Sequence, residues 1–225
     1  MRRRQAVVLI AAVILLGAAA APAQAPVEDQ GTLVVTQRGQ ALGEEHFILH
    51  SDAGGTRLDA TLDYSVSGKP VRQRAALRLG PRGALKSYEW SEGASASITL
   101  KYANGRIDAH YQAAKGTGRD YQFEMPATTS ILDENVFSLW EVLAARYDWA
   151  KGGAQSFGVF VPHSGDPSHV TLTAVHPPHA LPGEATLHAE TDQASLNLLL
   201  AHGRLLQIDV PAAGVVIRRV PVTGR

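Results

Sequence analysis

Histidine is the residue type that first suggests chemistry in this sequence, because six of its nine histidines fall between residues 163 and 202. Imidazole nitrogens bind zinc and copper, and only two prolines separate His176 from His179. Among these six, no two have the i, i+4 spacing of a helical zinc motif, and the sequence contains no H-E-x-x-H. We therefore expect no metal site and interpret the group as strand and loop residues: His163, His169, His176, His179, His188 and His202.

Nucleophiles and paired carboxylates give no catalytic pattern either. The sequence has no cysteine, no G-x-S-x-G elbow and no glycine-rich phosphate loop. Glu44 and Glu45 are neighbours in a predicted strand, so their side chains should point to opposite faces of the sheet. Asp133 is expected to cap a helix, with Glu134 near the positive end of the helix dipole. We expect neither a catalytic residue nor a cofactor, and therefore a protein that is not an enzyme.

Aromatic residues are the remaining candidates for a binding site. Five of them lie close together in the sequence and are the candidate ligand-binding residues: Trp140, Tyr147, Trp149, Phe157 and Phe160. One interpretation is that they line or cover an apolar pocket, since the mouths of β-barrels often hold ligands. The other is that they form ordinary core beneath a helix, which is the more frequent role of such a stripe. The sequence leaves both interpretations open and favours core.

One helix is predicted to carry the first of these aromatic residues. Val136, Leu139, Trp140 and Leu143 recur at the i, i+3, i+4 and i+7 positions of an amphipathic helix, and Tyr147 extends the stripe. We therefore expect a helix near 133–147, followed by a break at the adjacent glycines 152 and 153. Its single apolar stripe must cover one face or one open end of a sheet.

Strands are predicted almost everywhere else. Residues 56–67 and 71–79 alternate between apolar and polar side chains, and Asp59 and Asp63 are expected near arginines of the second strand. Asn104-Gly105 predicts a tight hairpin turn. Eight strands are expected before the helix, at 32–37, 44–50, 56–67, 71–79, 84–91, 95–103, 106–114 and 119–125. Six are expected after it, at 155–161, 169–175, 184–190, 194–200, 204–210 and 215–220. This rhythm predicts a mainly β protein: one antiparallel meander curved into an open or closed barrel, with the amphipathic helix packed against it.

The amino terminus predicts export. Arg2, Arg3 and Arg4 precede an uncharged apolar run at 6–17, and A-x-A sequences follow up to Ala25. These are the features of a secretory signal peptide, so we expect residues 1–25 to be removed and 26–225 to form a single domain without a transmembrane segment. Without those arginines, 18 basic residues face 21 acidic ones. That balance does not provide the basic surface that nucleic-acid binding requires. We therefore expect a periplasmic or secreted protein.

Two short segments give the chain a family resemblance. Arg146-Tyr147-Asp148-Trp149 precedes Gly152-Gly153, Gln155 and a strand that runs to Pro162, and Gly203-Arg204-Leu205-Leu206 lies near the end. With this layout the chain resembles a broad group of uncharacterised exported bacterial β-proteins that form curved antiparallel half-barrels. Their general shape is similar to that of periplasmic lipoprotein carriers, in which a curved sheet wraps a helix and holds acyl chains. The resemblance implies no catalytic residues.

The first functional hypothesis is therefore an exported, non-enzymatic protein that binds a lipid or another apolar or amphipathic ligand in the concave sheet face. The alternative is a structural or envelope-assembly protein that recruits an envelope protein through a sheet edge or face. An enzyme ranks last, and a histidine, a carboxylate and a hydroxyl meeting in one cleft would favour it.

Overall fold

One continuous sheet contains every strand of the structure, a computed structural model that describes residues 27–66, 69–175 and 181–220. The predicted signal peptide at 1–25 lies outside these described residues. The first eight strands are β1 Val27–Gln37, β2 Gln40–Asp52, β3 Gly55–Val66, β4 Lys69–Leu79, β5 Leu85–Glu92, β6 Ala96–Ala103, β7 Arg106–Gln112 and β8 Arg119–Glu124. The others are β9 Ser130–Ile131, β10 Ala154–Val161, β11 Asp166–Val175, β12 Glu184–Thr191, β13 Ser195–Ala201, β14 Arg204–Val210 and β15 Val215–Val220.

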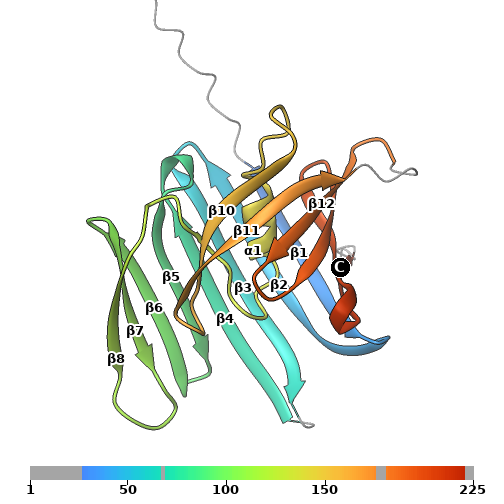
Figure 1. The fold of residues 1–225 in the computed structure, drawn as a ribbon. Helices are drawn as coiled ribbons and strands as arrows, with labels where there is room; N and C mark the ends of the chain where they lie inside the picture. Colours follow the sequence, from blue (N-terminus) through green and yellow to red (C-terminus); the bar gives the residue numbers. More distant parts are fainter. Residues whose placement is uncertain (1–26, 67–68, 176–180, 221–225) are drawn as a thin grey trace, which may run out of the picture.

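The sheet consists of two meanders, which are joined where β1, the first strand in sequence, pairs with β15, the last. Its order is β8 to β1, then β15 down to β9, and every neighbouring pair is antiparallel except β9 with β10. Thr32 of β1 lies opposite Val220 of β15. The sheet is not closed, because β8 and β9 are its two ends. Figure 1 shows the first eight strands as one wide layer, with β10 to β12 crossing in front of it and α1 between them. The predicted antiparallel, barrel-like β fold is confirmed.

Alternating side chains decide which face of the sheet is buried. Leu58, Ala60 and Leu62 of β3 are buried, whereas Asp59 and Asp63, at alternate positions, face outward. Asp63 accepts hydrogen bonds from Arg72 at 2.6 and 2.8 Å, and Asp59 accepts one from Arg78 at 2.8 Å, as the alternation predicted. These exposed pairs contribute little to stability, about 0.2–1 kcal/mol each.

Short turns explain why successive strands follow one another so closely in the sequence. Asn104 and Gly105 have φ angles of 53° and 82°, which confirms the predicted hairpin between β6 and β7. Strand β2 begins earlier than predicted, because Arg38 and Gly39 form the turn with φ angles of 49° and 81°. Gly43 therefore lies inside β2, where an added Cβ atom would come within 2.5 Å of the Asp63 carbonyl oxygen. There the glycine serves close strand packing rather than a turn.

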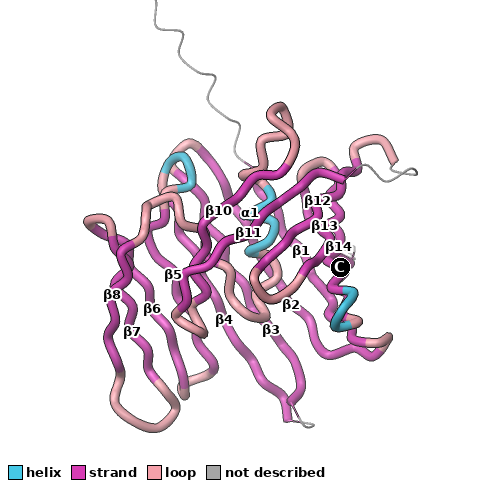
Figure 2. The backbone as a smooth tube through the Cα atoms, viewed as in Figure 1, coloured by secondary structure: helices cyan, strands magenta, loops and turns pink. Residues whose placement is uncertain are grey.

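The helix α1 spans only Leu139–Ala144, which is shorter than the predicted 133–147. Asn135 takes the left-handed φ of 68°, so the chain between Asp133 and Ser138 turns instead of continuing the helix. Asp133 consequently does not cap α1. Figure 2 shows α1 as a short helical segment inside the curve of the sheet. Two single-turn 3₁₀ segments, η1 Pro81–Gly83 and η2 Pro211–Ala213, are the other helical elements of the described chain. None of its helices is long and apolar enough to cross a membrane.

Candidate functional site

Glu45 of β2 fixes the beginning of α1. Its carboxylate accepts hydrogen bonds from the Phe137 N–H at 2.6 Å, the Ser138 N–H at 3.2 Å and the Ser138 hydroxyl. It lies on the inward face with Phe47, whereas its neighbour Glu44 points outward, as predicted. Burial raises the pKa of Glu45 to about 7, although the hydrogen bonds from Ser138 and Phe137 favour its charged form. The carboxyl group thus supplies the cap that Asp133 was expected to supply.

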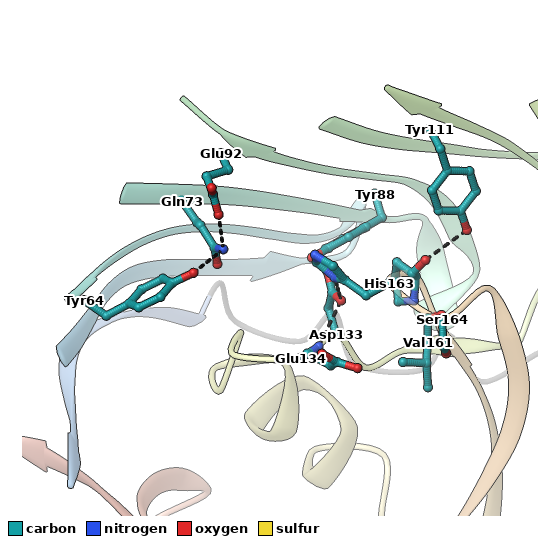
Figure 3. Close-up of polar contacts among 11 residues, drawn as sticks. Tyr64, Gln73, Tyr88, Glu92, Tyr111, Asp133, Glu134, Val161, His163 and Ser164 are labelled. Atoms are coloured by element: carbon teal, nitrogen blue, oxygen red, sulfur yellow. Dashed lines mark hydrogen bonds and ion pairs between the residues drawn. The ribbon is translucent and has the colours of Figure 1, made fainter. Parts of the chain in front are cut away.

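Asp133 instead forms a buried cluster with Tyr88 of β5 and His163, which follows β10. One carboxylate oxygen accepts the Tyr88 hydroxyl, and the other contacts His163 Nδ1 (Figure 3). Burial disfavours the imidazolium, but the hydrogen bond and the charge of Asp133 outweigh it and raise the pKa of His163. Burial and the same carboxylate raise the pKa of Tyr88 well above its usual range. The ring of Trp90 packs edge-on against His163, with 4.4 Å between the ring centroids.

This cluster brings together a histidine, a carboxylate and a hydroxyl, which are the groups of an acid–base site. Their hydrogen bonds point to a structural role. The Tyr88 hydroxyl donates to Asp133, and the Ser164 hydroxyl next to His163 donates to the Val161 carbonyl at 3.4 Å. No other hydroxyl group forms a hydrogen bond with these three side chains within the described residues. The three side chains join β5, the segment before α1 and the end of β10.

The same end of β10 also contacts the last strands of the first meander. The Tyr111 hydroxyl of β7 donates to the Pro162 carbonyl at 2.9 Å (Figure 3), and Phe123 of β8 packs against Phe160 with centroids 4.8 Å apart. Side chains therefore bridge a part of the structure where no ladder of backbone hydrogen bonds joins the two meanders. We call this region the seam, defined by Tyr88, Tyr111, Asp133 and His163.

A second buried polar cluster joins α1 to β1, β14 and β15. Asp29 of β1 accepts a hydrogen bond from Arg219 of β15 at 2.7 Å. The Arg204 Nε atom of β14 lies 3.6 Å from the other oxygen of the same carboxylate. Although burial opposes its charge, hydrogen bonds with Glu141 and Arg219 hold the pKa of Asp29 below its usual value. Burial raises the pKa of Glu141 of α1 to about 8, with Asp29 acting in the same direction and Arg219 against it. The proton of this carboxyl pair therefore resides on Glu141.

Glu141 retains an unused hydrogen-bonding atom. Its side chain is only 5 % exposed, and within the described residues its Oε2 has no hydrogen-bond partner. The Arg219 Nη2 atom is 3.9 Å from it, beyond hydrogen-bond distance. A buried polar atom without a partner costs about 1–3 kcal/mol.

This atom belongs to a residue that lines a cavity of about 720 Å³ at one end of the concave face, which we call the end cavity. Its walls come from the ends of β2, β3 and β4, from η1, from α1 and from the turn between β13 and β14. The apolar part consists of Leu49, Leu79, Val142 and Ala145. The charged part consists of Asp29, Asp52, Arg82, Glu141, Arg146 and Arg204. The end cavity is therefore amphipathic and large enough for a small lipid-like molecule.

The five predicted aromatic residues do not gather at this cavity. Tyr147 and Phe160 are buried, and the Tyr147 hydroxyl donates to the Gly153 carbonyl at 2.7 Å. Trp149 is 49 % exposed and packs edge-on against Tyr147. Trp140 and Phe157 are half-buried against the core. The structure thus brings Tyr147 and Trp149 together, places Phe160 at the seam, and leaves all five outside the lining of the end cavity.

The histidines of 163–202 are also separated. His163 contacts Asp133, and His188 contacts Asn197 at 2.9 Å. His176 and His179 lie outside the described residues. Within those residues, no three histidine, aspartate or glutamate side chains are grouped as metal ligands.

The curved, open antiparallel sheet with a short helix inside defines a β-barrel-like fold. Among solved structures, a β-barrel-like protein of the domain of unknown function DUF1849 from Brucella abortus is similar, with a TM-score of 0.53. That match covers 86 % of this chain and 96 % of the other at 10 % sequence identity, so it shows a shared fold alone. The sequence matches no protein-family model and no curated protein.

Proposed function

We propose that the protein is an exported, non-enzymatic binding protein whose end cavity holds an amphipathic ligand. The observation that carries the proposal is the cavity itself: about 720 Å³, with an apolar wall and a charged rim on the concave side of the sheet. Small-molecule sites generally occupy about 300–1,000 Å³ and combine apolar walls with a few polar groups. The general shape of lipoprotein carriers, in which a curved sheet surrounds a helix, supports the same proposal.

Export rests on Arg2 to Arg4, the apolar run at 6–17 and the A-x-A sequences that follow. We place the ligand against Val142 of α1 and Ala145, which directly follows α1, on the flank of the helix that lines the cavity. The aromatic residues Trp140 and Tyr147 belong to the same segment but contribute to packing.

A cavity-filling variant tests the proposal. Ala145 is exposed and lines the end cavity, so Ala145→Phe should fill part of the space without disturbing the core. We expect it to weaken binding of an apolar fluorescent probe by at least about tenfold. The matched control is Val175→Phe, at an exposed position outside the cavity. Unchanged binding in a folded Ala145→Phe variant, checked by circular dichroism, would overturn the proposed site.

Native mass spectrometry of the protein purified from its own envelope provides an independent test. A retained lipid would support ligand binding. Protein that carries no lipid and also binds no apolar probe would contradict it.

One observation favours a second candidate function, the recruitment of an envelope protein. Strand β8 is one end of the sheet, and five of its six residues are exposed. Such an edge can accept an added strand from a partner. Gln122→Lys would place a charge on this edge, so it should abolish recovery of a specific partner from envelope extracts. Equal recovery by the wild-type protein and by Gln122→Lys would argue against this role.

A further inference from the structure

We infer that the end cavity selects amphipathic ligands with an anionic head group, held between Arg82 and Arg204 while the chain packs along Leu49, Leu79 and Val142. This inference rests on the proposed function and specifies its ligand class. Carboxylate and phosphate head groups share the required chemistry, because the planar guanidinium fork pairs with both.

The first argument is uncompensated positive charge. Arg82 lines the end cavity and has no ion-pair partner within the described residues. Arg146 donates to the Thr128 carbonyl at 2.7 Å and to the Ser130 hydroxyl, and both of these oxygens are neutral. Arg204 shares the single carboxylate of Asp29 with Arg219. With Glu141 protonated, three arginines of the lining face only two ionised carboxylates, those of Asp29 and Asp52, so the charge of the cavity is positive on balance.

The second argument concerns Arg82 alone. Its backbone is left-handed, with φ of 60° and ψ of 24°, and it lies between Gly80 and Gly83 in η1. A left-handed non-glycine residue costs about 1 kcal/mol or more and is found preferentially at ligand clamps and other functional sites. In η1 this conformation sets an exposed arginine at the cavity rim.

The third argument comes from Glu141. A pair of ionised carboxylates would attract a cation, but Glu141 keeps its proton at neutral pH and Asp29 is neutralised by Arg219. The Glu141 proton is shared with Asp29, so this carboxyl pair carries one negative charge rather than two. The groups that face Glu141 are Asp29 of β1, Arg219 of β15 and the Leu205 N–H of β14. Arg219 offsets the one remaining charge, so the pair offers little attraction to an ammonium group.

The test compares four amphiphiles with the same twelve-carbon chain: the carboxylate, the monophosphate, the alcohol and the trimethylammonium. Each is titrated by calorimetry below its micelle concentration against the full folded protein. We expect at least one of the two anions to bind about tenfold or more tightly than the alcohol, and the ammonium to bind weakest. Which of the two anions binds tighter distinguishes a fatty-acid from a phospholipid source.

Substitutions test whether Arg82 at the cavity rim is responsible for the preference for anions. Arg82→Gln should reduce the affinity for the anion about fivefold or more and leave the affinity for the alcohol unchanged. Arg57→Gln, on the outward face of β3, is the matched control and should change neither affinity. Glu141→Gln should remove the loss of anion affinity that we expect for the wild-type protein between about pH 7 and pH 9, where Glu141 loses its proton.

The outcomes separate the two proposals. If the alcohol binds as tightly as the anions, or if the ammonium binds tightest, the head-group inference fails while the cavity remains a binding site. If Arg82→Gln and Arg57→Gln behave alike, the rim assignment fails. If none of the four amphiphiles binds and the protein from its own envelope holds no lipid, the proposed function fails as well.

Discussion

Replacement of Glu45 by glutamine tests the energetic role of the buried acid that caps α1. Glutamine preserves the shape of the side chain and an oxygen that can accept the Phe137 and Ser138 N–H groups. It removes the charge that forms as the pH rises. The substitution should therefore change how stability depends on pH more than it changes stability in acid.

The sign and magnitude follow from the pKa of Glu45. Burial raises it from 4.5 to about 7, so between these values the folded protein holds a proton that the unfolded chain has lost. Stability is therefore greatest below the unfolded value and falls as the pH rises through about 7. A tenfold difference in proton affinity corresponds to about 1.4 kcal/mol, so Glu45 accounts for a loss of roughly 3 kcal/mol.

Urea unfolding followed by far-ultraviolet circular dichroism, at steps from about pH 4 to pH 8, measures this loss. The wild-type protein should lose roughly 3 kcal/mol more stability over that range than Glu45→Gln does. Glu44→Gln is the matched control, because Glu44 is the adjacent residue with its side chain 47 % exposed and facing outward. Parallel pH profiles for the wild type and Glu45→Gln would refute the reasoning.

Three further predictions concern the packing of α1, the seam and the start of β3. Leu143→Ala removes a side chain of α1 that is 1 % exposed and should lower the free energy of unfolding by about 2–5 kcal/mol in chemical denaturation. Trp149→Ala, at an exposed position, should lower it by under about 1 kcal/mol. Similar losses for the two variants would contradict the burial of the apolar stripe of α1. Asp133→Asn places an amide against Tyr88 or His163 and should lower the free energy of unfolding in urea by about 2–3 kcal/mol. The raised pKa of His163 should be lost in an NMR titration, and an unchanged titration would disprove the contact. Gly55→Ala should lower the free energy of unfolding by more than about 1 kcal/mol, because φ is 135° and the new Cβ would lie 2.1 Å from the Leu79 carbonyl oxygen of the neighbouring strand β4. Wild-type stability would show that the backbone at this position can relax.

The strands could be predicted because their signals are local. Alternation with period 2 identified both faces of β3 and β4, and Asn104-Gly105 identified a turn by its backbone preference. The beginning of α1 could not be predicted in this way. Asp133 is an excellent N-cap by residue type, but the left-handed Asn135 and the distant Glu45 decide where the helix begins.

The candidate site depends on contacts between residues far apart in the sequence. Asp29, Glu141 and Arg219 belong to three different elements, and no spacing rule relates them. A partial signal was present, because Glu45 shares its strand parity with the buried Phe47 and Leu49. A charged residue at an inward position of an alternating strand indicates a buried polar contact, although the alternation does not identify the partner.

Pairing of β1 with β15 makes the order of synthesis matter for this protein. A chain that emerges from its amino terminus can complete the β1–β8 meander early, since each of those strands pairs with its neighbour in sequence. One edge of β1 stays unpaired until the last strand is made, and this edge carries Thr32-Leu33-Val34-Val35-Thr36, in which four of the five residues are β-branched. Such an edge readily accepts foreign strands. The half-made protein is therefore most vulnerable to aggregation at β1, and this vulnerability ends only when residues 215–220 arrive.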